Sequence, residues 1–273
     1  MPNLDATFSA LADPTRRAIL ARLPARDQWA VEFGAWDGQL MSNTAALADA
    51  GYRRVLIEAD QRRLRALRRK YKSDPNTVPI LAMVGWSESD SLDTILETTA
   101  VPHDFDLLSI DIDGNDYHVW KAVRKYRPKV VVIEFNPTIR NGVEFVQPPD
   151  PELNQSSSIT SLVGLGRSKG YELAAATEFN AVFVHEDLHP CLGIEDNSVD
   201  RLRTDKTWQA EIFFGFDGHA IIQGGRGLHW HGMAVPTDVR LVPRFFDGFP
   251  GRWSRPKRGL LRVWTYLRRV RPE

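Results

Sequence analysis

A short run in the first part of the chain has the composition of a ligand-binding turn. Glu32-Phe-Gly34-Ala35-Trp36-Asp-Gly38 follows an apolar stretch and precedes a segment of helical pattern. Gly34 permits a tight turn, and Gly38 lets the next helix begin close to a ligand. A phosphate-binding turn has the pattern G-x-G-x-x-G, but Trp36 replaces its second glycine and leaves less room for a pyrophosphate. The turn therefore suits a ligand with an amino-acid part and a ribose, and a purely structural turn is the alternative.

Two further positions extend this candidate ligand site. Glu58 closes the apolar run 53–59 and lies 24 residues after Gly34. An acid at the end of the neighbouring strand can accept hydrogen bonds from both hydroxyls of a ribose, and the alternative is an acid that caps a helix. Trp86 follows the run 78–84 in a Gly-Trp-Ser turn, where an adenine can lie against the backbone and a side chain. The alternative there is a turn alone.

Acidic residues gather at the end of the apolar run 105–111. Asp111 and Asp113 stand there, where doubly wound folds place their ligand crevice. The D-x-D-G-N-D pattern is similar to a calcium loop, but a strand precedes it, and position twelve counted from Asp111 is Ala122 instead of a carboxylate. We therefore exclude that calcium site. His118 follows at the start of a helix and is either a base or a packed or exposed histidine.

The run 129–135 supplies the last candidate groups. It is almost continuously apolar, as in a strand buried on both faces, and Glu134 and Asn136 stand at its end. Together with Asp111 they can offer oxygen ligands to a hard cation such as Mg²⁺. A polar cluster that satisfies its own hydrogen bonds without a metal is the alternative.

The elements that must position these groups alternate between strand and helix patterns. The predicted strands are 29–33, 53–59, 78–84, 105–111, 129–135, 171–177 and 180–185, and the predicted helices are 39–50, 61–72, 91–99, 117–126 and 158–169. This order predicts an α/β fold with a doubly wound, mostly parallel seven-stranded sheet that is closed by an antiparallel strand.

The two ends of the chain depart from this alternation. Residues 1–28 predict a helical N-terminal extension, and residues 188–273, rich in glycine, proline and aromatic residues, predict a C-terminal appendage or cap. The helix expected at 259–271 is basic and amphipathic, so it packs on the domain or a partner chain, or contacts anionic lipid or an acidic glycan. His229 and His231 alternate along a strand, but without a third ligand nearby they do not predict a metal site.

Composition narrows the classes of function. Among 273 residues, 35 basic side chains balance 35 acidic ones, so net charge gives no reason to expect nucleic acid or a membrane as partner. The single cysteine, Cys191, excludes a disulfide framework and suits a reducing compartment. No run of about 18 apolar residues predicts a membrane-spanning helix, and the N-terminus does not have the pattern of a secretory signal. We expect a cytoplasmic protein, with its oligomeric state, including a homo-oligomer, left open.

The order of the motifs resembles one family. VEFGAWDG, VLIEAD, LLSIDIDGNDYHVW, KVVVIEFN and SSSITSLVGLGRSKGYELAAATEFNAVFV follow one another over residues 29–187 as in class I S-adenosylmethionine-dependent methyltransferases, and they are most similar to the FkbM-like group. The resemblance implies a Rossmann-like methyltransferase domain with S-adenosylmethionine as methyl donor. It also implies O-methylation of a small-molecule or glycan acceptor, such as a sugar or secondary metabolite. A separate stretch, LADPTRRAIL, resembles the start of ArsR-type repressors, but it is too short to predict a DNA-binding domain.

The resemblance also implies roles for the residues named above. The donor would be held by Glu32, Gly34, Ala35 and Gly38 at its methionine part, by Glu58 at the ribose, and by Trp86 at the adenine. Asp111 would lie near the point of methyl transfer. Asp113 is our first choice for the base that removes the acceptor proton, with Asp111, Glu134 and His118 as alternatives, and a Mg²⁺ ion on Asp111, Glu134 and Asn136 stays open. Asp113 and the following Asn-Asp pair replace residues commoner in the family, which leaves the acceptor undetermined.

Two other classes of function fit parts of the sequence. A non-catalytic protein that binds a nucleoside-like ligand on the same fold is the main alternative. A nicotinamide oxidoreductase is disfavoured by Trp36 in the turn and by the closing pair of strands.

Overall fold

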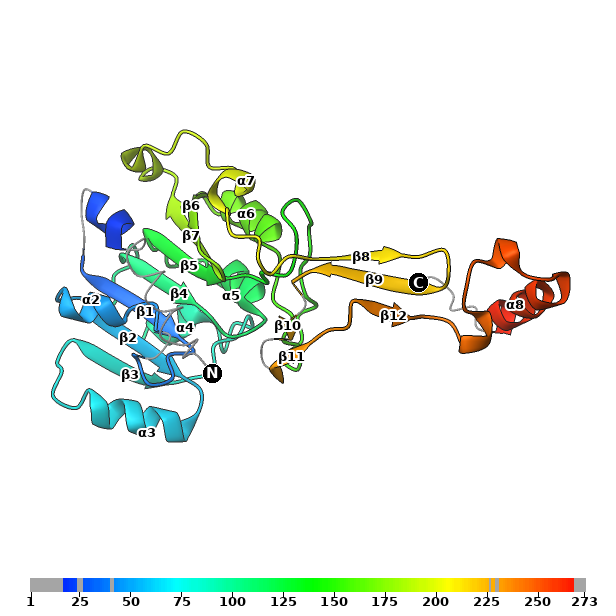
Figure 1. Ribbon diagram of the computed structural model, residues 1–273. Coiled ribbons are helices and arrows are strands. Elements are labelled where there is room, and N and C mark those ends of the chain that lie inside the picture. Colours follow the sequence, from blue (N-terminus) through cyan, green and yellow to red (C-terminus); the bar gives the residue numbers. More distant parts are fainter. Residues whose placement is uncertain (1–16, 24–26, 40–41, 226, 229–230, 268–273) are drawn as a thin grey trace. The chain divides into compact units, whose positions relative to one another are not determined.

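Contacts between residues divide the chain into two compact units. The computed structural model describes residues 17–23, 27–39, 42–225, 227–228 and 231–267. Of these, the residues up to Pro137 and Asn141–Asp205 form the first unit, and Thr138–Arg140 with the residues from Lys206 onward form the second (Figure 1). The sequence places the start of the C-terminal part at residue 188, whereas residues 188–205 group with the first unit. The functional division into domains stays a prediction.

The first unit is built on one sheet. Its strands are β1 (Trp29–Phe33), β2 (Arg53–Glu58), β3 (Thr77–Leu81), β4 (Leu107–Ile110), β5 (Val130–Glu134), β6 (Tyr171–Ala176) and β7 (Asn180–His185). Their order is β3-β2-β1-β4-β5-β7-β6, in which β1 to β5 are parallel and β7 runs antiparallel to both of its neighbours. This confirms the predicted doubly wound, mostly parallel sheet of seven strands.

Short helices connect the strands. They are α2 (Ala45–Asp49), α3 (Gln61–Lys70), α4 (Leu92–Leu96), α5 (Asp116–Ala122), α6 (Ile159–Ser168), the 3₁₀ helix η1 (His189–Leu192) and α7 (Val199–Leu202). Side chains of Asp60, Ser91 and Ser158 accept backbone N–H groups and so begin α3, α4 and α6. The helix α2 is shorter than the predicted 39–50, because the carboxylate of Glu32 accepts hydrogen bonds from residues 42–44 and holds them in a non-helical bend.

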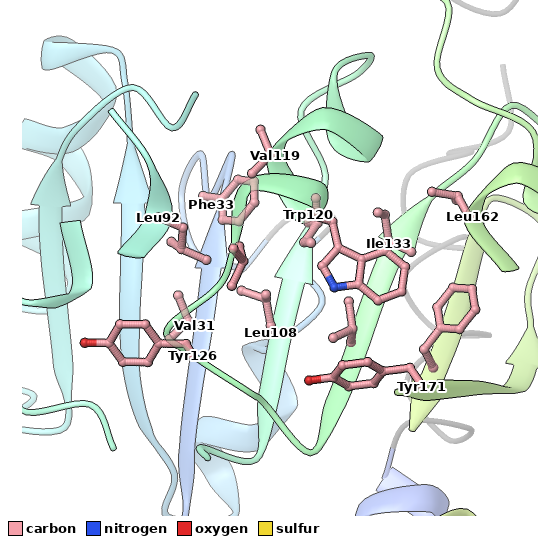
Figure 2. Packing of buried hydrophobic residues seen from close by; sticks show 14 of the residues in the cluster. Val31, Phe33, Leu92, Leu108, Val119, Trp120, Tyr126, Ile133, Leu162 and Tyr171 are labelled. Carbon is pink, nitrogen blue, oxygen red and sulfur yellow. The ribbon is translucent and has the colours of Figure 1, made fainter. Parts of the chain in front are cut away.

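One face of the sheet carries the larger core. Val31 of β1, Leu108 of β4 and Ile133 of β5 point to this face, and Trp120 of α5 covers them (Figure 2). Trp120 is 1% exposed, and its ring lies 4.9 Å from that of Phe183 on β7. This packing fixes α5, the helix that follows the acidic run, against the centre of the sheet.

The opposite face of β5 is also apolar, which explains the continuous apolar sequence of that strand. Val130 and Val132 lie on this side and are fully buried. Ile19 and Leu20 of the helical residues 17–22 belong to the same cluster. The described part of the N-terminal extension therefore packs on the sheet. Most of the stretch that is similar to ArsR-type repressors lies outside the described residues.

The second unit consists of small sheets and a terminal helix. Its elements are β8 (Ala210–Phe214), β9 (His219–Gly224), β10 (Gly227–Leu228), β11 (Met233–Ala234), β12 (Asp238–Arg240), the 3₁₀ helices η3 (Arg244–Phe246) and η4 (Pro250–Arg252), and α8 (Arg255–Leu267). β12, β9 and β8 form an antiparallel sheet, and β10 pairs with β11. The helix α8 starts four residues before the predicted one. His229, one of the two alternating histidines, lies outside the described residues. Within the described residues, no helix combines the length and apolarity needed to cross a membrane.

Candidate functional site

The carboxyl ends of β1 and β4 lie next to each other at the point where the winding of the sheet reverses. The chain continues from β1 to β2 and β3 on one side, whereas β4 and β5 lie on the other. Doubly wound folds bind their ligands outside such a point. Gly34 follows β1 with φ of 71°, and a Cβ atom added to it would lie 2.2 Å from the backbone oxygen of Asp111. Only glycine permits this approach, so the two strand ends meet at backbone distance.

Glu32 of β1 is directed into the loop before α2. Its Oε2 accepts hydrogen bonds from Ser42 Oγ and Thr44 Oγ1, and its Oε1 accepts one from the backbone N–H of Asn43, each at 2.6 Å. The side-chain amide of Asn43 in turn donates to Ser109 Oγ of β4 at 2.9 Å. The Glu32 carboxylate thus holds the loop against two strands.

Glu58 ends β2 and is 4% exposed. Its Oε2 accepts a hydrogen bond from the backbone N–H of Trp36 at 2.9 Å, and its Oε1 accepts one from the N–H of Asp60 at 2.8 Å. The N-cap of α3 is Asp60, so Glu58 is not the helix-capping acid of the alternative interpretation. Each carboxylate oxygen has two lone pairs, so both oxygens keep acceptor capacity for a ligand.

Trp36 stands at the tip of the turn after β1. Its φ of 45° lies in the left-handed region, and its side chain is 43% exposed. The guanidinium carbon of Arg63 on α3 lies 5.3 Å from the Trp36 ring centroid. The half-exposed indole thus lies against the guanidinium of Arg63 on α3.

Gly38 and Ala35 pack against the interior of the protein. A Cβ atom on Gly38 would lie 2.8 Å from Leu56 Cδ1 and 2.9 Å from Tyr71 Cε2, and the Gly38 carbonyl accepts a hydrogen bond from Tyr71 Oη at 2.9 Å. Ala35 is 2% exposed, and its N–H donates to the carbonyl of Ile57 at 3.3 Å. Both residues therefore shape the turn by packing it on β2 and α3.

Three carboxylates come together after β4 and β5. Oxygens of Asp111, Asp113 and Glu134 lie within 4.8 Å of one another. Burial, and then the neighbouring charges of Asp111, Asp116 and Asp113, raise the pKa of Glu134 well above its usual value. Partial desolvation by neighbouring atoms also raises the pKa of Asp113, which is exposed at the surface. Ser156 Oγ donates a hydrogen bond to Glu134 Oε2 at 3.4 Å. The cluster therefore favours a proton or a bound cation.

Asp116 is a site residue that the sequence interpretation did not select. It is 1% exposed, and its carboxylate accepts hydrogen bonds from the backbone N–H groups of Ile112 and Gly114, both at 2.9 Å. Burial raises the pKa of Asp116 to about 6 against the lowering effect of these hydrogen bonds. Asp116 holds the loop in which Asp113 has φ of 59°. An acid directly before the predicted helix 117–126 was the available signal.

Three further candidates lie around this cluster. His118 Nε2 lies 2.8 Å from the carbonyl oxygen of Gln147, to which it donates a proton, so only Nδ1 can accept one. The Trp86 ring centroid is 5.8 Å from that of His118. The side-chain amide of Asn136 donates to the carbonyl of Gln155 at 2.8 Å, which directs it toward the loop before α6. The structure thus joins Asp111, Asp113 and Glu134, and it gives Asn136 a partner in a different loop.

Part of the chain matches a known protein family, and several solved structures are similar to it at low identity. Residues 72–173 match the methyltransferase FkbM domain family. No curated protein matches the chain. Among solved structures, the N-terminal domain of EvdMO1 with SAH bound is 14% identical, with a TM-score of 0.44, over 66% of this chain and 82% of that chain. Magnesium protoporphyrin IX methyltransferase (ChlM) from Synechocystis PCC 6803 with bound SAM is 9% identical, with a TM-score of 0.43, over 68% and 85%.

The family match spans the segment from the end of α3 to the start of β6 and includes the acidic run after β4. Its position coincides with the part of the sheet that carries the three carboxylates. Together with the strand order, it confirms the resemblance of this segment to FkbM-like methyltransferases and the Rossmann-like fold of the first unit.

Proposed function

We propose that the chain is an S-adenosylmethionine-dependent methyltransferase that methylates an oxygen atom of a sugar, glycan or secondary metabolite. S-adenosylmethionine, when bound, supplies an electrophilic methyl group on a positively charged sulfur atom. The observation that carries the proposal is the close approach of Gly34 to the Asp111 backbone where the winding of the sheet reverses, next to the segment that matches the FkbM family.

The residues around the crevice fit the chemistry of this donor. Glu58 offers two buried carboxylate oxygens to the ribose hydroxyls, and the Trp36 and Trp86 side chains offer apolar surface to an adenine. Gly34 leaves space at the strand ends where any side chain would meet the backbone of Asp111. The three-carboxylate cluster suits the positive groups of the donor, since a nearby cation stabilises carboxylates that otherwise repel. Because the donor loses its charge in the reaction, this attraction supports binding more than rate.

Asp113 is the proposed base for the acceptor hydroxyl. Partial desolvation raises the pKa of Asp113, although the residue is exposed at the surface, so its ionised carboxylate is a stronger proton acceptor than that of a fully solvated aspartate. The hydrogen bonds of Asp116 to Ile112 and Gly114 hold the loop that presents it. His118 is the alternative base, since its Nε2 donates to Gln147 and its Nδ1 can still accept a proton. The remainder of catalysis is positioning of the acceptor oxygen.

A metal ion on the same carboxylates is the alternative mechanism. Asp111, Asp113 and Glu134 lie close enough to act as oxygen ligands of one hard cation. Such an ion would acidify the acceptor hydroxyl and make a base less important. Activity that survives EDTA but falls at least about a hundredfold in Asp113→Asn supports the base. Loss with EDTA that is restored by Mg²⁺ supports the metal.

The direct test of the function is donor turnover. The purified chain is incubated with S-adenosylmethionine and a mixture of sugars and hydroxylated metabolites, and S-adenosylhomocysteine is measured by mass spectrometry. Asp104→Asn, a change of an exposed acid of the same unit, is the matched control for Asp113→Asn. Donor binding without any product in the presence of acceptors supports the non-catalytic nucleoside-binding alternative. Absence of donor binding contradicts both.

A further inference from the structure

The second unit buries little apolar surface of its own. Among its described residues, the buried hydrophobic side chains are Ala220 and Phe246. Small sheets usually need a covered hydrophobic face for stability. Much apolar surface of this unit is exposed, including Phe214, which is 74% exposed, and Phe216, which is 86% exposed. Exposed surface of this kind indicates a binding surface.

The helix α8, red in Figure 1, has two apolar stripes, and only one of them is packed. Trp264 belongs to the inner stripe, and its ring centroid lies 5.6 Å from that of Phe246. The outer stripe follows helical spacing of three and four residues. It consists of Leu260, Val263 and Leu267, which are 53%, 57% and 77% exposed.

Exposed aromatic residues continue this outer surface. Phe245 and Phe249, in the segment just before α8, are 58% and 52% exposed. The Lys257 ammonium lies 5.2 Å from the Phe245 ring centroid and 4.2 Å from that of Trp253, so α8 is attached to this aromatic segment. We call the outer stripe together with Phe245 and Phe249 the α8 surface.

The charge on the side of α8 away from the outer stripe is of one sign. Arg255, Arg258 and Arg262 are exposed and follow spacing of three and four residues, so they line one side of α8. Residues 248–272 contain eight arginine and lysine residues and no aspartate or glutamate, although the whole chain has no net charge. The preceding acid, Asp247, is paired with Arg240 at 2.9 Å. Within residues 248–272, no acidic side chain balances these cations.

We propose that the α8 surface docks on a lipid surface with anionic headgroups. An interfacial helix places leucine and aromatic side chains at the headgroup boundary and arginine and lysine side chains near anionic lipids. A soluble polyanion would use the arginines but would leave Leu260, Val263 and Leu267 in water. This inference concerns the second unit and is independent of methyl transfer.

The test is flotation of the full chain with vesicles. One set contains phosphatidylcholine alone, and the other contains about one third phosphatidylglycerol. We expect binding to the anionic vesicles at least tenfold stronger than to the neutral ones. Raising the salt concentration from about 0.1 M to about 1 M should weaken this binding, since the Debye length falls from about 10 Å to about 3 Å.

Two variants test the contributions of the arginine and the leucine side chains of α8 separately. Arg255→Gln/Arg258→Gln/Arg262→Gln should weaken binding to anionic vesicles at least about tenfold, since each cation near such a surface strengthens binding about fivefold. The matched control is Arg62→Gln/Arg65→Gln/Arg69→Gln on α3, a basic helix whose Leu64 and Leu67 are fully buried. Leu260→Gln/Leu267→Gln should also lose vesicle binding while the circular dichroism spectrum stays unchanged.

Several outcomes overturn the proposal. They are equal binding to neutral and anionic vesicles, absence of binding to either, and an equal effect of the α3 control. Binding to heparin that survives Leu260→Gln/Leu267→Gln, without vesicle binding, would assign the arginines to a soluble polyanion. A dimer in light scattering that these leucine variants dissociate, again without vesicle binding, would assign the surface to a second copy of the chain.

Discussion

Substitution of Glu58 gives the most direct test of the proposed donor site. Glu58→Ala removes the acceptors for the ribose hydroxyls and also those for the Trp36 and Asp60 N–H groups. We expect S-adenosylmethionine to bind about 10- to 150-fold more weakly, a loss of about 1.5–3 kcal/mol, as measured by calorimetry. Asp104→Ala is the control. Glu58→Gln keeps one acceptor oxygen, so its affinity for S-adenosylmethionine should lie between those of Glu58→Ala and the native chain. Affinities of Glu58→Ala and the native chain within twofold would remove Glu58 from the site.

Glu134 gives a prediction about pH. The pKa of Glu134 is raised by burial and by neighbouring carboxylates, so the native state binds this proton more tightly than the unfolded state does. Stability from Glu134 is therefore complete below its ordinary pKa of 4.5 and is lost as pH rises through the elevated native value. Glu134→Gln does not titrate, so its free energy of unfolding relative to the native chain should increase with pH in this window, by at most about 1.4 kcal/mol per pH unit. Urea unfolding of both proteins at several pH values measures this difference in the free energy of unfolding. If the difference does not change with pH, the pKa of Glu134 is not raised in the folded protein.

The sequence predicts single residues well where their position depends on strand ends. Asp111, Asp113 and Glu134 were expected at neighbouring strand ends, and they lie within 4.8 Å. The hydrogen-bond partners of these side chains were harder to predict from the sequence, because they lie in loops. Nothing in the strand pattern showed that Glu32 would accept hydrogen bonds from residues 42–44, or that Asn136 would donate to Gln155.

The turn after β1 shows how an element depends on its backbone. Gly34→Ala would place a Cβ atom 2.2 Å from the Asp111 backbone oxygen in addition to the cost of a left-handed φ. Gly51→Ala is a matched control, since Gly51 has φ of 82° but no atom within 4 Å of the added Cβ. We expect Gly51→Ala to cost about 1–2 kcal/mol of unfolding free energy and Gly34→Ala clearly more, with loss of donor binding. Equal destabilisation in urea unfolding would show that β1 and β4 do not meet as described.

Element boundaries were less predictable than element order. The sequence predicted each of the seven strands and their parallel core, because buried runs such as that of β5 carry a strong local signal. The extent of α2 depended instead on the hydrogen bonds between Glu32 and residues 42–44 directly before the helix, so it was overestimated. The assignment of residues 188–205 to the first unit also depends on tertiary contacts, since Leu192 joins the core cluster of that unit and Arg22 donates to its carbonyl.

The two units differ in the kind of surface that they bury. The first unit has buried clusters on both faces of its sheet, whereas the second leaves its sheet and α8 largely exposed among the described residues. Every residue that we propose for donor binding lies in the first unit. The second unit is therefore suited to attachment, and the first contains the complete proposed donor site.

This division makes a prediction about the whole molecule. A chain that ends after Asp205 keeps both core clusters of the first unit, although the hydrogen bond from Ala210 to Thr138 is lost. We expect it to unfold cooperatively, to bind S-adenosylmethionine within twofold of the full chain, and to lose flotation with anionic vesicles. Circular dichroism, calorimetry and flotation measure the three properties separately. A folded chain whose donor affinity falls more than tenfold would mean that the second unit contributes to the donor site, and retained flotation would mean that the lipid surface is recognised by the first unit.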